Sequence, residues 1–67
     1  MEGKAIGKFL DRHVKLELRS GFGIKGTIIE LYDDCFLFRT NQADSVIEYN
    51  DVQMLVEKNG GVTNDWY

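Results

Sequence analysis

The spacing of hydrophobic residues along the chain changes after residue 12. Within residues 3–12, the apolar side chains of Ile6, Phe9 and Leu10 stand three and four positions apart, which is the spacing of one face of an amphipathic helix. Residues 13–19 (HVKLELR) alternate instead between apolar and charged side chains, which is typical of a half-buried strand. The chain is therefore predicted to begin with a short helix that packs on a sheet.

Four more strands are predicted after this one, at residues 24–32, 35–39, 45–49 and 52–57. Short turns separate them, and Gly26 inside the second strand indicates a sharp bend or a close approach of another backbone segment. The predicted fold is mostly β: a short N-terminal helix followed by a five-stranded, strongly bent antiparallel open barrel. Residues 1–58 form the predicted domain, and residues 59–67, which begin with Asn-Gly-Gly, form a predicted flexible C-terminal tail.

Apolar residues occupy both faces of the last two predicted strands. Val46 and Ile47 are neighbours and so point to opposite faces, as do Met54 and Leu55. A half-exposed sheet has one polar face, so this pattern predicts that other subunits cover these strands by joining edge to edge; a tightly closed monomeric barrel would explain part of it. A chain of 67 residues with one cysteine and one histidine has no internal disulfide or structural zinc site, which also favours a homo-oligomer.

The charge is divided unevenly between two parts of the chain. Residues 1–26 carry six basic and three acidic side chains, whereas residues 27–67 carry two basic and eight acidic ones, for a net charge of −3. The first part therefore predicts one positive surface among negative ones. The pI near 4.9 argues against a general nucleic-acid coat but allows a local nucleic-acid site.

Several classes of function have no signal in the sequence. No apolar run is long enough to span a membrane and no signal-peptide pattern is present, so a cytoplasmic protein without membrane partners is expected. No nucleophile–base set, phosphate-binding loop or metal-ligand spacing is present, so neither an enzyme nor a cofactor is expected. His13 is interpreted as a residue at the start of a strand and Cys35 as a small buried hydrophobe.

A further pattern combines two glycines, an acidic turn and the strands around them. Gly21 and Gly26 are five positions apart, follow an alternating strand and precede Asp33. A second stretch, residues 46–52 (VIEYNDV), passes from an apolar strand through a tight turn into the last strand. Together with the short N-terminal helix, these features resemble the Sm/LSm family, which includes bacterial Hfq-like and archaeal Sm-like proteins. The resemblance covers about residues 4–57 and implies the family's SH3-type barrel.

The resemblance implies a ring of about six or seven identical subunits that binds single-stranded RNA, U-rich or A-rich, without catalysing a reaction. The positions that match the family's two nucleotide-binding loops hold Tyr32, Asp33 and Asp34 in the first and Tyr49 and Asn50 in the second. The family's aspartate falls at Tyr32, or at Asp33 with a one-residue slip. Tyr49 and Asn50 would supply a ring and a base-edge donor; alternatively, Tyr49 packs in the barrel and Asn50 only serves the turn.

Basic residues offer contacts to RNA phosphates outside these loops. Lys4, Lys8 and Arg12 recur at fourfold spacing along the predicted helix. They form either a phosphate-binding stripe repeated around a ring or a solvated helix face. Lys25 lies with Phe22 near the first turn, on the side where Hfq-like rings bind purine-rich strands. Phe22 is there either exposed to a partner or folded back on the core.

Other features favour a ring that does not bind RNA. The uridine-contacting asparagine of the family is replaced by Phe36 or Leu37, and Tyr49 and Asn50 stand where the family has Arg-Gly or Lys-His. The alternative function is therefore a homo-oligomeric scaffold or protein-interaction module without RNA binding. A monomeric SH3-like peptide binder is a third alternative, against which the apolar residues on both faces of residues 46–56 argue.

The acidic turn and the last two residues of the sequence each suggest a further hypothesis. Asp33 and Asp34, repeated around a ring, would place a set of carboxylates that repels phosphate or attracts a divalent cation. Trp66 and Tyr67 end the sequence with two aromatic side chains, which would dock on a neighbouring subunit or on a partner.

Overall fold

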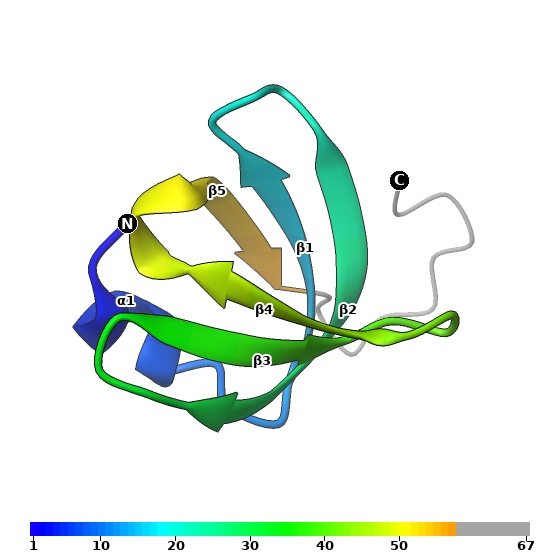
Figure 1. Ribbon diagram of the computed structural model, residues 1–67, viewed down its shortest axis with the longest axis horizontal. Helices are drawn as coiled ribbons and strands as arrows, with labels where there is room; N and C mark the ends of the chain where they lie inside the picture. Colours follow the sequence, from blue (N-terminus) through cyan, green and yellow to red (C-terminus); the bar gives the residue numbers. More distant parts are fainter. Residues whose placement is uncertain (58–67) are drawn as a thin grey trace.

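The protein has one short helix and five strands in the part of the chain that the structure describes, residues 1–57 of a computed structural model. The elements are α1 (Gly3–Gly7), β1 (His13–Leu18), β2 (Gly23–Leu31), β3 (Cys35–Arg39), β4 (Asp44–Glu48), the 3₁₀ turn η1 (Tyr49–Asp51) and β5 (Val52–Glu57). The strands form one curved antiparallel sheet in the order β4-β3-β2-β1-β5, with α1 at one end of it (Figure 1). Because β4 and β5 are its edges, the sheet is not closed. The mostly-β prediction is confirmed, and the predicted tail lies outside the described residues.

The helix is shorter than predicted, because the chain turns after Gly7. Leu10 forms an isolated parallel bridge with Ile28 of β2. Asp11 takes a left-handed conformation with φ 66°, and its N–H donates to the Ile28 carbonyl at 2.7 Å. The prediction of a helix over residues 3–12 is therefore wrong beyond Gly7. Within the described chain, no helix has the length and apolar character needed to cross a membrane.

The strands follow the predicted alternation. β3 and β5 have the predicted bounds, and β1, β2 and β4 differ from the prediction by one residue at their ends. β4 ends at Glu48 because Tyr49 already belongs to η1, which carries the chain from one sheet edge to the other. The alternation therefore located the strands, whereas their ends depend on how the chain leaves the sheet.

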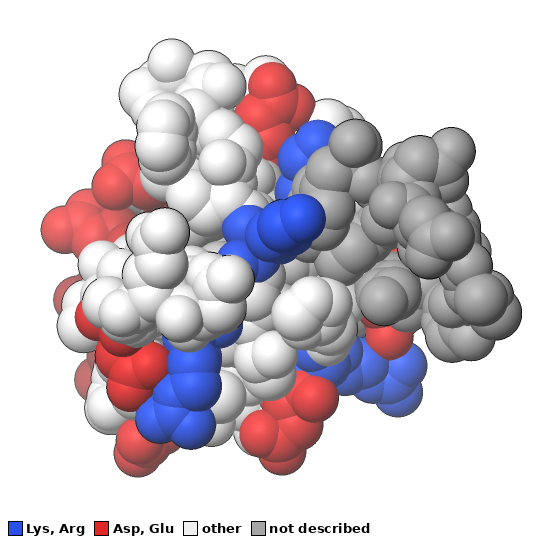
Figure 2. All heavy atoms as spheres, turned by 90° about the vertical axis from the view of Figure 1, so that its right-hand side faces the viewer, with Lys and Arg blue, Asp and Glu red and all other residues white. Residues whose placement is uncertain are grey.

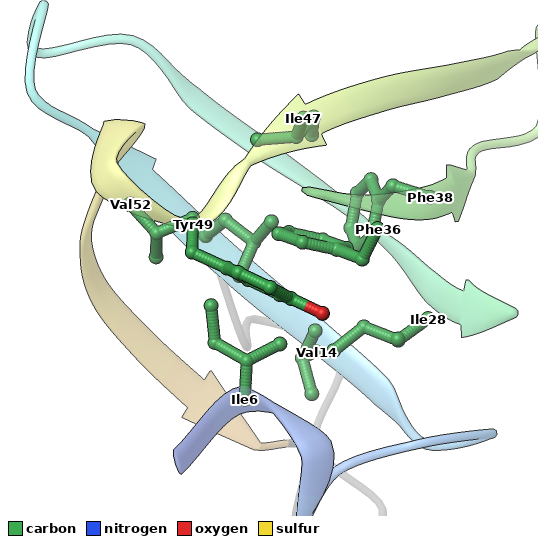
Figure 3. Packing of buried hydrophobic residues seen from close by; sticks show 9 residues of the cluster. Ile6, Val14, Ile28, Phe36, Phe38, Ile47, Tyr49 and Val52 are labelled. Atoms are coloured by element: carbon green, nitrogen blue, oxygen red, sulfur yellow. The ribbon is translucent and has the colours of Figure 1, made fainter. Parts of the chain in front are cut away.

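The core gathers apolar side chains from α1, η1 and all five strands (Figure 3). Its members are Ile6, Val14, Leu16, Ile28, Phe36, Phe38, Ile47, Tyr49 and Val52. Ile6 points from α1 into this cluster, so the helix covers one end of the core even though it has only five residues. Full burial of side chains of this size contributes roughly 1.5–3 kcal/mol each. This packing stabilises a helix that is too short to form alone.

Gly26 allows β2 and β3 to approach closely, as its place inside a predicted strand indicated. A Cβ atom at this position would overlap the carbonyl oxygen of Arg39 and lie 3.0 Å from Cε2 of Phe38. Further along β2, the register with β3 shifts between Ile28 and Glu30, which leaves one extra residue in β2. The glycine and the bulge together account for the strong curvature of this strand.

Candidate nucleic-acid interface

The two loops predicted to bind nucleotides lie against each other at one end of the molecule. The Tyr49 N–H donates to the Asp34 carbonyl at 3.1 Å, and the Tyr49 hydroxyl donates to the Tyr32 carbonyl at 2.6 Å. Between them is a surface pocket of about 360 Å³, lined by Met1, Glu2, Gly3, Asp33, Asp34, Glu48, Tyr49 and Asn50. The structure therefore brings Tyr32, Asp33, Tyr49 and Asn50 together, although they come from separate segments of the chain.

The Tyr49 ring belongs to the core. It is only 9% exposed and stacks on the Phe36 ring, with centroids 5.6 Å apart and an interplanar angle of 14° (Figure 3). Gly3 packs so closely against it that a Cβ atom there would lie 2.7 Å from Cε2 of the ring. A ring held in this way is not available to stack on a base. Of the two alternatives for Tyr49, packing in the core is the one that the structure has. Its predicted role as an exposed RNA contact is corrected.

Tyr32 and Asn50 are the exposed members of this loop pair. The Tyr32 ring is 43% exposed, and the pKa of its hydroxyl is raised, first by desolvation and then by a hydrogen bond with Glu30. Asn50 is exposed in η1, and its carbonyl accepts a hydrogen bond from Arg19 Nε at 2.5 Å. Arg19 also holds η1 through its N–H, which donates to the Asp51 carbonyl at 2.8 Å.

Acidic side chains dominate the surroundings of these loops. The carboxylates that line the pocket are those of Glu2, Asp33, Asp34 and Glu48. The ammonium group of Met1 is also part of the pocket, but it donates to the carbonyls of Tyr49 at 3.0 Å and Val52 at 2.9 Å. A phosphate would meet net negative charge here. Among residues 1–57, no group of three or more His, Cys, Asp or Glu side chains is arranged to hold a metal ion.

The predicted basic stripe is not the face of one helix. Lys4 lies in α1, Lys8 follows its end, and Arg12 lies beyond the turn that leads into β1. Arg12 Nη1 forms an ion pair with Glu57 Oε2 at 2.6 Å, and the pKa of Arg12 is raised, mainly by this hydrogen bond and also by the charge of Glu57. The stripe prediction is therefore corrected, because it required a helix that continues to residue 12.

Lys25 lies on the outer face of the sheet, beside a second lysine. Lys25 of β2 pairs with Lys15 of β1, and Lys15 pairs with Val56 of β5, so the three side chains share the face opposite to the core. A pocket of about 300 Å³ lies between the two lysines, lined also by Gly23 and Ile24. In Figure 2, basic side chains stand among uncharged ones on one side of the molecule, with the acidic ones mostly towards its margin.

Phe22 stands at the tip of the β1–β2 hairpin and is 63% exposed. Of its two predicted positions, exposed to a partner or folded back on the core, the structure shows the exposed one. Its neighbours Gly21 and Gly23 carry no side chain that could cover the ring. Phe22 precedes Lys25 by three residues in the chain, and an exposed ring together with lysines is the composition of a single-strand binding surface. The sequence pattern indicated Lys25 and Phe22 but not Lys15, which joins them only through the pairing of β1 with β2.

No protein-family model matches the chain, and no curated protein matches it. Two surfaces are candidates for the function: the acidic loop pair and the lysine-bearing outer face of β1, β2 and β5.

Proposed function

We propose that the chain is a subunit of a homo-oligomeric, Sm-like ring that binds single-stranded RNA without catalysing a reaction. The observation that carries the proposal is that both sheet edges expose apolar side chains. Val46 on β4 is 65% exposed, and Met54 and Val56 on β5 are also exposed. Pairing of β4 with β5 of the next copy would cover these side chains from the side of the sheet edge while the outer face of β5 stays open, and it would leave no free edge once a ring closes.

The arrangement of β2 and β3 supports the Sm-like assignment. The family's aspartate position falls at Tyr32 when the sequence is read without a gap, and at Asp33 with a slip of one residue. The bulge between Ile28 and Glu30 supplies one extra residue in the strand that leads to this turn. The slip therefore has a physical reason, and Asp33 is the residue that we assign to the family's position.

Charge distribution supports RNA on the outer face of the sheet. Lys15 and Lys25 would contact phosphates, and the exposed Phe22 ring offers a base a stacking surface. Tyr32 and Asn50 offer a ring and an amide at the loop pair, but the carboxylates beside them disfavour the RNA backbone. The same acidic pocket favours the second candidate function, a homo-oligomeric scaffold that binds no RNA.

The ring is tested by light scattering after size-exclusion chromatography. We expect a discrete assembly of about six or seven subunits. Val46→Asp on the β4 edge should shift the protein to smaller species, because an unpaired carboxylate would be buried in the interface. The control is Gln42→Asp, which adds the same charge at an exposed position of the β3–β4 loop. A stable wild-type monomer would contradict the ring.

RNA binding is tested by fluorescence anisotropy with short U-rich and A-rich oligonucleotides at two salt concentrations. Phosphate contacts are strongest at low salt, so we expect binding there that weakens as salt is added. Absence of binding at low salt, with the assembly intact, would contradict RNA binding and leave the scaffold function. A stable monomer that binds RNA would contradict the ring alone.

A further inference from the structure

A groove on the outer face of β1, β2 and β5 has no occupant among the described residues. It has a volume of about 320 Å³ and is lined by Lys15, Glu17, Gly21, Gly23, Met54 and Val56. Lys15 pairs with Val56 and Glu17 with Met54, so these four side chains stand on one face of the sheet. Met54 is 48% exposed and Val56 43%, so two adjacent apolar side chains form one wall of the groove.

The groove is hollow because two glycines stand where larger side chains would fill it. A Cβ atom on Gly23 would meet only Lys15 Cε at 3.7 Å and the Leu16 carbonyl oxygen at 3.9 Å, and a Cβ atom on Gly21 would meet nothing within 4 Å. Lys15 lines one side, whereas Glu17 adds a single negative charge. The charges of Lys15 and Glu17 offset each other in the lining, so the groove fits a segment that places an apolar or aromatic side chain against Met54 and Val56.

We propose that residues 58–67 of the same chain occupy this groove, with Trp66 packed against Met54 and Val56. These residues lie outside the part that the structure describes, and their sequence is KNGGVTNDWY. In an extended segment, Val62 and Trp66 point to the same face because side chains alternate along a strand. Asp65 points to the opposite face of such a segment, so the proposed contact is made by the apolar side chains of Val62 and Trp66.

The attachment point of the segment makes this contact a local one. β5 ends at Glu57, next to Val56 in the wall of the groove. Residues 59–61 are Asn-Gly-Gly, which favours a turn back towards the sheet. Six extended residues beyond that turn reach up to about 20 Å, whereas the wall from Val56 to Met54 extends about 7 Å. A short tether of this kind gives an effective concentration in the millimolar range, so a weak contact suffices.

Trp66 is the only tryptophan of the chain and reports on the contact directly. The fluorescence of the full chain is measured without RNA, so the result is independent of the proposed function. We expect Trp66 to emit at shorter wavelength, and to be quenched less by acrylamide, than in a synthetic peptide of residues 58–67. Emission and quenching equal to those of the peptide would overturn the proposal.

Two groove variants locate the contact. Met54→Glu places a charge on the apolar wall, and Gly23→Leu fills the groove from a position where a Cβ atom makes only ordinary van der Waals contacts. Both should shift the emission of Trp66 towards that of the peptide. The matched control is Gln53→Glu, which adds the same charge at an exposed neighbour of Met54 that does not line the groove, and it should leave the emission unchanged.

Circular dichroism shows whether each variant is folded, and Gly23→Leu keeps the test decisive if Met54→Glu unfolds. Unchanged emission in a folded Gly23→Leu protein would overturn the proposal. The emission of the wild type is also followed on dilution. Protection that disappears with dilution would overturn docking within one chain and assign the groove to a segment of a second copy.

Discussion

The loop pair and the outer-face groove differ in how firmly they are built and in the charge they present. At the loop pair, hydrogen bonds from Tyr49 to the Asp34 and Tyr32 carbonyls fix the main chain, and carboxylates line the surface. The groove is lined by two glycines, by one lysine and one glutamate, and by the exposed apolar side chains of Met54 and Val56. A residue at a family's binding position can therefore bind RNA only if the fold leaves its side chain exposed and if the neighbouring side chains do not repel phosphate.

The largest expected effect is a difference in stability between substitutions of the buried Tyr49 and of the exposed Tyr32. Tyr49→Ala removes a core ring and its stacking on Phe36, so it should lower the free energy of unfolding by about 3–5 kcal/mol. Tyr32→Ala removes a half-exposed ring at the same loop pair and should change it by about 0.5 kcal/mol or less. Urea unfolding measures both. If the two variants lost similar free energies of unfolding, Tyr49 would not be more important to the core than Tyr32.

Charge substitutions show which of the two regions meets the RNA backbone. Lys15→Gln with Lys25→Gln should weaken binding and reduce the salt dependence, by a slope of about 0.7 for each phosphate of a single strand that a lysine no longer neutralises. Asp33→Asn with Asp34→Asn, at the loop pair, should leave that slope unchanged. Anisotropy titrations across a salt series give the slopes. Tighter binding and a steeper slope in the aspartate variant, with the lysine variant unchanged, would move the RNA site to the loops, because a repulsion between carboxylates and phosphates would have been removed.

A smaller effect is expected from the hydroxyl of Tyr49 alone. Tyr49→Phe keeps the ring and its stacking but removes the hydrogen bond to the Tyr32 carbonyl, which should cost about 1 kcal/mol. RNA affinity should be unchanged, because the ring is buried in the wild type. Thermal unfolding and anisotropy of the same preparation check both statements. Loss of RNA affinity without loss of stability would restore a binding role for this residue.

The smallest effect concerns an exposed ion pair at the far end of the sheet. Arg39 Nε donates to Asp44 Oδ1 at 2.8 Å, and this hydrogen bond is the main cause that lowers the pKa of Asp44. A lowered folded-state pKa stabilises the fold above the unfolded value of about 3.9, and that contribution is lost as the pH falls through the folded pKa. Asp44→Asn should therefore lower Tm slightly at neutral pH and not in acid. An equal difference in Tm at both pH values would show that the ion pair is not its cause.

Much of the fold follows from the sequence because side-chain alternation is a local property. The bounds of β3 and β5 were predicted, and Gly26 was recognised as a place where backbones meet. The end of α1 was not, because the turn after Gly7 depends on contacts of Leu10 and Asp11 with Ile28, a residue distant in sequence. A periodic pattern of apolar residues continues through such a turn without a visible break.

For the candidate site, the sequence determined which residues fall at the loop positions, and the tertiary structure decided what they do. Tyr49 became a core residue because Gly3 and Phe36 enclose its ring, and neither is near it in the chain. Lys15 joined Lys25 only through the register of β1 and β2. Local patterns are set by neighbours along the chain, whereas exposure and charge surroundings are set by neighbours in space, and only the fold brings those together.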